Sequence, residues 1–66
     1  MRLTDLRSRL EATFGERYAA SVARDQVIPE LDGLTIDQAL SAGFDAQAIW
    51  RAVVAAYPDR VPVKLR

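Results

Sequence analysis

The chain contains no cysteine and no histidine. Without cysteine it cannot form a disulfide, and without either residue it lacks the usual ligands of a structural zinc site. It also lacks the side chains that most often act as nucleophile or general base near neutral pH. No glycine-rich loop could cradle phosphate, and the carboxylates show no metal-binding spacing. We therefore expect a protein that is not an enzyme and that holds no metal, cofactor or small-molecule ligand.

Long apolar runs and an excess of one charge are missing as well. No apolar stretch reaches membrane-spanning length, and the N-terminal residues lack the apolar segment of a signal peptide. Nine basic residues balance nine acidic ones, so the net charge is zero. A neutral chain has no general attraction to nucleic acid or to anionic membranes. These absences favour a cytoplasmic protein with no membrane partner, and they disfavour nucleic acid as a partner.

The length of 66 residues indicates one domain, residues 1–66, of which 50% are apolar. This is near the lower limit for a chain that folds without disulfides or metal. The apolar core, or a partner subunit, must therefore supply the stability.

The strongest apolar pattern lies between Ala46 and Tyr57. Only Gln47 and Arg51 are polar in this stretch, and they fall on one narrow stripe of a helix. The apolar residues form two rows, Ile49–Val53–Ala56 and Trp50–Val54–Tyr57. A helix with so wide an apolar arc is normally buried on most sides. We expect it to be the helix around which the rest of the chain packs.

Three further helices are predicted. The first spans about Asp5 to Thr13, with Thr4 as its N-cap and an apolar face of Leu3, Leu6, Leu10 and Phe14. The second spans about Glu16 to Val27, with the inward residues Tyr18, Val22, Ala19 and Ala23. The third is short, Ile36 to Ala42, and starts with a capping box of Thr35 and Gln38.

The remaining segments are predicted to be turns and a tail. Pro29 to Asp32 can form one short turn ended by Gly33, and Gly43 ends the third helix. No segment alternates long enough to predict a strand. Residues 59–66, with two prolines, are expected to be extended and partly loose. The predicted fold is all-α, a small bundle of three main helices plus one short helix.

Several segments together resemble a known family. They are the N-terminal Met1–Asp5, Ala-Arg-Asp-x-Val at Ala23–Val27, Thr-x-x-x-Ala-Leu-x-x-Gly at Thr35–Gly43 and Trp-Arg-Ala-Val at Trp50–Val53. The chain resembles a small bacterial family known as domain of unknown function 3046. The resemblance implies a compact helical, cytoplasmic protein, often encoded close to recombination genes. It implies no activity and no functional residues.

The segment Ile36–Ala55 has the spacing of a helix-turn-helix element. Ala39 is small enough for close helix packing, Gly43 suits the turn, and Ile49 can fill the junction. As a DNA reader the second helix would present Asp45, Ala46, Gln47, Trp50, Arg51 and Val54. Of these, Gln47 and Arg51 alone could read bases, while Asp45 would repel phosphate. We therefore favour an ordinary helix pair over a DNA-binding one, because a fold does not imply a function.

Trp50 has two interpretations. It can be a core residue whose indole N–H finds a carbonyl, or an anchor for a partner. If the first helix leaves the Trp50 row open, that row becomes an apolar binding or dimer surface. The candidate partner-binding residues are then Trp50, Val54, Tyr57, Gln47 and Arg51. The predicted function is protein–protein interaction or regulation, with a DNA-associated protein and a structural homodimer as alternatives.

Overall fold

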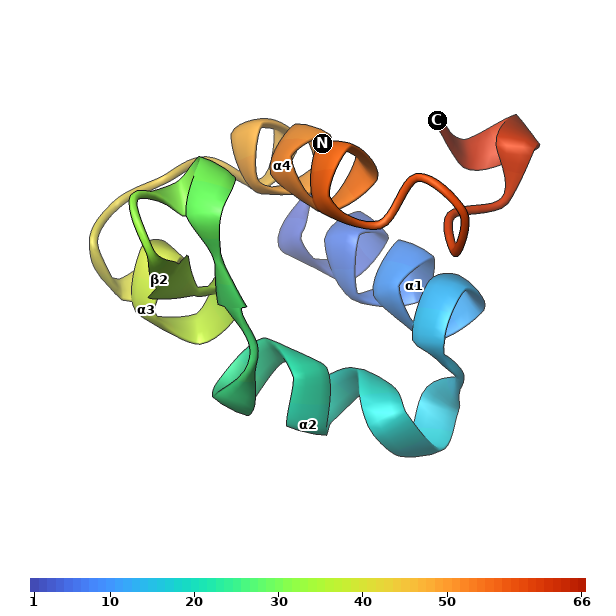
Figure 1. Ribbon diagram of the computed structural model, residues 1–66, viewed down its shortest axis with the longest axis horizontal. Coiled ribbons are helices and arrows are strands. Elements are labelled where there is room, and N and C mark those ends of the chain that lie inside the picture. The colour runs from blue at the N-terminus through green and yellow to red at the C-terminus, as the bar shows by residue number, and fades with distance from the viewer.

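Four α-helices form most of the structure, a computed structural model that describes residues 1–66 (Figure 1). They are α1 (Leu3–Phe14), α2 (Glu16–Asp25), α3 (Ile36–Ser41) and α4 (Ala46–Ala56). A two-stranded antiparallel sheet pairs β1 (Val27–Ile28) with β2 (Leu34–Thr35), and the turns η1 (Pro29–Leu31) and η2 (Val63–Leu65) are 3-10 helices. The expected helical fold is thus confirmed in outline.

The expected absence of strands is wrong. Val27 pairs with Thr35 and Ile28 with Leu34, on either side of η1. The chain reverses at the end of η1 because Asp32 and Gly33 both adopt positive φ, 56° and 77°. Strands of two residues are too short for an alternating pattern to reveal them. The expected turn from Pro29 to Gly33 is confirmed, and it is the tip of this hairpin.

The first helix begins earlier than predicted. Its N-cap is Arg2 rather than Thr4, and the Asp5 carboxylate accepts a hydrogen bond from the Arg2 backbone N–H at 3.0 Å. Asp5 therefore satisfies a backbone donor at the helix start, where its negative charge also complements the helix dipole. Gly15, with φ of 89°, separates α1 from α2 and gives the chain its sharp change of direction.

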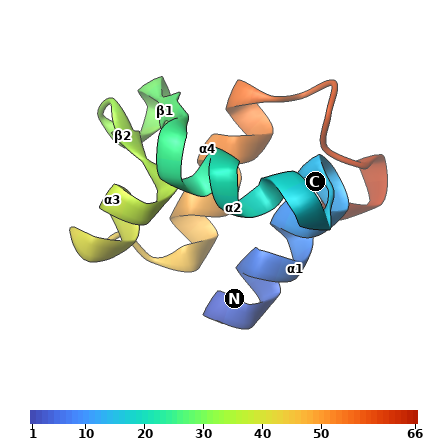
Figure 2. The same cartoon turned by 90° about the horizontal axis from the view of Figure 1, so that it is seen from below.

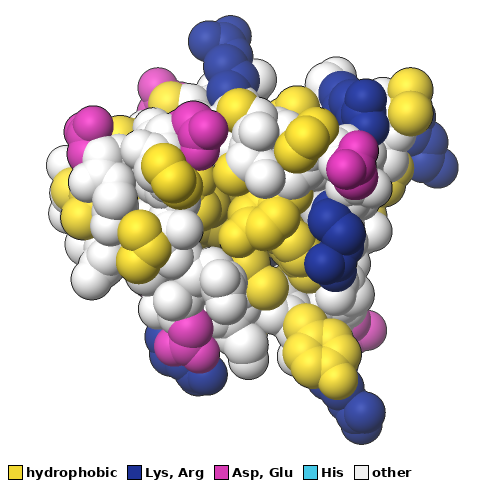
Figure 3. Space-filling view, in the orientation of Figure 1, with side chains coloured by type: hydrophobic (Ala, Val, Ile, Leu, Met, Phe, Trp, Pro, Cys, Tyr) yellow, Lys and Arg dark blue, Asp and Glu magenta, His cyan; other side chains and the backbone are white.

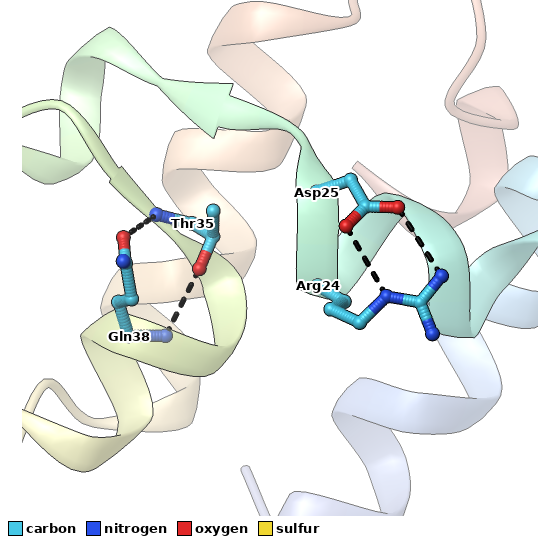
Figure 4. A network of polar contacts seen from close by, with 4 residues as sticks. All are labelled: Arg24, Asp25, Thr35 and Gln38. Carbon is cyan, nitrogen blue, oxygen red and sulfur yellow. Dashed lines mark hydrogen bonds and ion pairs between the residues drawn. The ribbon is translucent and has the colours of Figure 1, made fainter.

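The predicted cap of α3 is confirmed. The Thr35 hydroxyl accepts from the Gln38 backbone N–H at 3.1 Å, and the Gln38 side chain accepts from the Thr35 N–H at 2.9 Å (Figure 4). At the other end, Gly43 adopts a φ of 95°. The Phe44 N–H then bonds to the Ala39 carbonyl and the Gly43 N–H to the Leu40 carbonyl, which completes a Schellman motif.

The helix α4 lies against most of the other elements. It packs against η1, α1, α3 and β1, and the Asp45 carboxylate caps its start at 2.8 Å from the Ala48 N–H. Ile49 and Val53 are fully buried, and Trp50 is 2% exposed. The prediction that this helix is the centre of the core is confirmed. The other large, fully buried side chains are Leu6, Ile28, Leu31 and Ile36.

The predicted inward face of α2 is wrong at Tyr18, whose side chain is 62% exposed. Ala19 and Ala23 are buried and Val22 is partly buried, so the helix turns its small residues to the core. The helix also ends at Asp25 rather than Val27, because Val27 is already in β1. Leu3, expected on the apolar face of α1, is 43% exposed.

The C-terminal segment is not the extended tail that the two prolines suggested. Val61 is 3% exposed, and Val63–Leu65 forms the turn η2. The Arg66 guanidinium donates a hydrogen bond to the Pro58 carbonyl, which closes the segment on itself. This segment and the β-hairpin lie at opposite ends of the molecule in both views (Figures 1 and 2).

Candidate functional site

Trp50 lies under the C-terminal segment. Its indole Nε1 donates a hydrogen bond to the Leu65 carbonyl at 2.9 Å, and the Arg9 guanidinium carbon is 5.7 Å from its ring centroid. A buried indole N–H needs such an acceptor, and an arginine over the ring adds a cation–π attraction. The core interpretation of Trp50 predicted the burial and the carbonyl partner, but not the contact with Arg9.

The other candidate residues of α4 are divided between core and surface. Gln47 and Arg51 are exposed, whereas Val54 and Tyr57 are partly buried and pack against the core. The structure therefore does not bring all five candidates together on one open surface. The row of Trp50, Val54 and Tyr57 is covered at Trp50 by α1 and by the chain around Leu65.

Tyr57 is the member of this row that reaches a cleft. Its ring contacts that of Phe14 edge to face, with centroids 5.1 Å apart and planes at 87°. The Arg60 guanidinium carbon lies 5.3 Å from the centroid of the same Phe14 ring. Both arrangements are favourable contacts of the aromatic quadrupole. Together they fix the end of α4 and the following turn against the end of α1.

A cleft opens between α2 and this aromatic cluster because α2 packs against α1, α3 and β2 rather than along α4. The cleft has a volume of about 350 Å³, and its lining residues are Phe14, Tyr18, Val22, Gln26, Tyr57 and Arg60. We call it the aromatic cleft. Figure 3 shows a hollow with hydrophobic side chains at its floor in the middle of this face.

The aromatic cleft is small for a cofactor site. Drug-sized ligands occupy clefts of about 300–1,000 Å³ that enclose most of their surface. A cleft at the lower end of that range, with the exposed Tyr18 on one wall, suits one or two side chains of a larger partner. One wall is the stripe of Tyr18 and Val22 of α2 and Gln26 at the C-cap of that helix, each four residues from the next.

A second groove, of about 260 Å³, lies between α1, α2 and α3. Leu6 and Leu10 of α1, Ile36 of α3 and the small Ala19 and Ala23 of α2 line it, and all five are buried core residues. Its remaining lining residues are Leu3, Arg7, Glu11, Glu16, Ala20, Asp37 and Leu40. This groove exists because alanines, not larger residues, face the core there.

The residues that suggested a helix-turn-helix element are divided between the core, a turn and the surface. Ala39 and Ile49 are fully buried, and Gly43 makes the turn. Trp50, which would stand in the middle of a groove-reading face, is buried beneath Leu65. Asp45, Gln47 and Arg51 are the exposed polar residues of the presumed reading face.

Arg24 and Asp25 form an exposed ion pair at the end of α2 (Figure 4), and neither residue lines the aromatic cleft. Its two side chains are 68% and 57% exposed and 3.1 Å apart. The hydrogen bond and the charge of Asp25 raise the pKa of Arg24 above its ordinary value. Both hydrogen bonds join the two side chains to each other, and neither reaches another element of the fold. Such exposed pairs contribute little stability.

Two kinds of site are absent from the structure. No group of three histidine, cysteine, aspartate or glutamate side chains is placed to hold a metal ion. No helix is both long enough and apolar enough to cross a membrane.

Sequence reasoning found Tyr57 but missed the rest of the aromatic cleft. The signal was present in α2, where Tyr18, Val22 and Gln26 form one stripe and Ala19 and Ala23 form the next. We assigned both apolar stripes to the core. In the structure the alanine stripe faces the core, and the β-hairpin follows α2 directly.

Comparison with known proteins gives one match. The model of a family described as "Protein of unknown function (DUF3046)" matches residues 1–64. No curated protein matches the chain, and no solved structure does.

Proposed function

We propose that this chain, which belongs to the DUF3046 family, is a non-enzymatic protein-interaction module. In this proposal the aromatic cleft between α2 and the end of α4 receives side chains of a partner protein. The observation that carries the proposal is the exposed Tyr18 beside Tyr57 and Arg60 at an apolar cleft.

The residue types of the cleft support a protein partner. Tyrosine and arginine are enriched among the residues that contribute most to protein–protein binding, and aromatic residues are enriched across interfaces generally. The cleft offers both types, with Phe14 and Tyr57 already fixed by their edge-to-face contact. A rigid aromatic floor loses little conformational freedom on binding, which favours affinity.

The DNA-associated alternative has weaker support. Gln47 and Arg51 are the two exposed side chains of α4 that could read bases, and neither lines the aromatic cleft. A neutral chain also lacks the phosphate attraction that supplies most nonspecific DNA affinity. The homodimer alternative is compatible with the cleft, and the molecular mass in solution decides it.

A selection from a random peptide library displayed on phage tests the proposal. The purified protein should enrich peptides whose affinity falls about tenfold or more for Tyr18→Ala. Val63→Ala is the matched control, because Val63 is an apolar residue that is 78% exposed and does not line the cleft. If no peptide is enriched, or if the enriched peptides bind Tyr18→Ala as tightly as the parent, the proposal is wrong.

A further inference from the structure

The polar groups around the aromatic cleft are unevenly distributed between donors and acceptors. Arg60 is the one charged residue that lines the cleft, and no aspartate or glutamate lines it. The two tyrosine hydroxyls and the Gln26 amide complete the polar lining. An arginine has five N–H donors and no acceptor, so the cleft as a whole is rich in donors.

Arg60 is also available to a partner. The side chain is exposed, and the one ion pair of the structure joins Arg24 to Asp25. The Arg60 guanidinium lies over the Phe14 ring, 5.3 Å from its centroid. A guanidinium that lies over an aromatic ring can still bind a carboxylate through its N–H groups. The contact with the ring thus restricts the Arg60 side chain, so less conformational entropy is lost when a partner binds.

From these observations we infer that the partner presents a short segment in which an apolar side chain is flanked by aspartate or glutamate. Its apolar side chain enters the aromatic cleft over Phe14 and Tyr57, and a neighbouring side-chain carboxylate binds Arg60. This inference rests on the proposed function and adds the chemistry of the partner. Charge complementarity is its basis, because the cleft carries one unpaired cation and no anion.

A segment of opposite chemistry fits less well. Lysine or arginine beside the apolar side chain would place two cations close together over one small cleft, and like charges oppose binding there. A nucleic acid could stack a base on Tyr18 and place a phosphate on Arg60. It would gain little elsewhere, since single-stranded binding relies on a continuous basic groove and the cleft offers a single cation.

Two phage-displayed peptide libraries of identical design separate these possibilities. Both randomise the same apolar positions, and they differ only at fixed flanking positions, which are aspartate or glutamate in one library and lysine or arginine in the other. All peptides are displayed at an internal position of the coat protein. They therefore have no terminal carboxylate, and the two libraries differ only in their charged side chains. We expect enrichment from the acidic library alone.

Substitution of Arg60 then tests the contact directly. Arg60→Gln should weaken the enriched acidic peptides about tenfold or more, as expected for the loss of a hydrogen bond to a charged group. Arg60→Glu should reject the acidic peptides and enrich binders from the basic library. Arg51→Gln is the matched control, because Arg51 is an exposed arginine outside the cleft. Circular dichroism and thermal melting check that each variant is folded.

The outcomes distinguish this inference from the proposed function. If both libraries are enriched equally, or if Arg60→Gln leaves affinity unchanged while Tyr18→Ala abolishes it, the acidic partner is wrong and the cleft remains a binding site. If neither library is enriched, both are wrong. Tighter binding of a fluorescent single-stranded oligothymidine than of any peptide, with the same dependence on Tyr18 and Arg60, would also overturn the inference.

Discussion

The helices α4 and α2 have nearly the same length, 11 and 10 residues, but opposite surroundings. α4 is apolar on almost every side and packs against η1, α1, α3 and β1. α2 packs against α1, α3 and β2 and leaves the stripe of Tyr18, Val22 and Gln26 beside an open cleft. In this chain the most apolar helix is therefore buried in the protein's own core. The open cleft is lined by α2, which packs against three other elements rather than four.

The largest expected effect is at Trp50 in α4. Trp50→Ala should reduce the free energy of unfolding by about 3–5 kcal/mol, because it removes a fully buried aromatic side chain and leaves a cavity. Chemical denaturation followed by far-UV circular dichroism measures the change. A loss below about 1 kcal/mol, as exposed sites give, would show that α4 is not enclosed as the structure describes.

The next effect concerns the acceptor of the Trp50 N–H. Deletion of residues 65–66 should cost about 1–3 kcal/mol, because the Trp50 N–H loses its acceptor, the Leu65 carbonyl, and the partly buried Leu65 side chain no longer packs against the core. The emission of Trp50 should also shift to longer wavelength as water reaches the indole. As a control, Lys64→Ala changes an exposed side chain of η2 and retains the Leu65 carbonyl. Unchanged stability and emission after the deletion would mean that the segment does not cover Trp50.

A smaller effect on stability is expected at the N-terminus of α4, which differs from that of α2. The Asp45 carboxylate caps α4, whereas Gly15 provides no side-chain cap for α2. Asp45→Ala should therefore lower the free energy of unfolding by about 1 kcal/mol. Asp45→Asn should lower it much less, since asparagine is an equally good N-cap. Thermal denaturation of both variants measures the difference. Asp59→Ala is the control, because Asp59 is an exposed aspartate that caps no helix. Equal melting temperatures for all three would contradict the assigned cap.

The smallest effect on stability is expected at Tyr18 of α2. Tyr18→Ala should change the free energy of unfolding by less than about 0.5 kcal/mol, because the side chain is mostly exposed. The same substitution is expected to weaken peptide binding about tenfold or more, so stability and binding should separate at this residue. Chemical denaturation beside the peptide titration measures both. A loss of stability as large as that of Trp50→Ala would place Tyr18 in the core and remove the contrast between the two helices.

The sequence predicted the features that depend on local chemistry. The cap of Thr35 and Gln38, the turn at Gly43 and the buried position of α4 each follow from residues close together in the chain. So did the core position of Trp50, including the need for a carbonyl acceptor. These predictions succeed because helix caps, positive φ angles and wide apolar arcs can each be recognised from residue types at short spacing in the sequence.

What could not be predicted depends on contacts between distant residues. The strands in which Val27 pairs with Thr35 are only two residues long, which is too short for an alternating pattern. Leu65 reaches Trp50 across 15 positions of the chain, which no local pattern encodes. The aromatic cleft joins Phe14, Tyr18 and Tyr57 from three helical segments. Its existence depends on α2 not lying along α4, and the apolar pattern of α2 alone permits either placement.

Acrylamide quenching of Trp50 fluorescence, measured across a dilution series with the molecular mass at each step, tests the central claim most directly. That claim is that α4 is enclosed by the chain's own α1 and C-terminal segment. We predict strong protection of Trp50 at every concentration, including those at which the mass is that of a single chain. Free quenching of the monomer, or protection that disappears as a dimer dissociates, would show that a partner rather than the chain itself covers this helix.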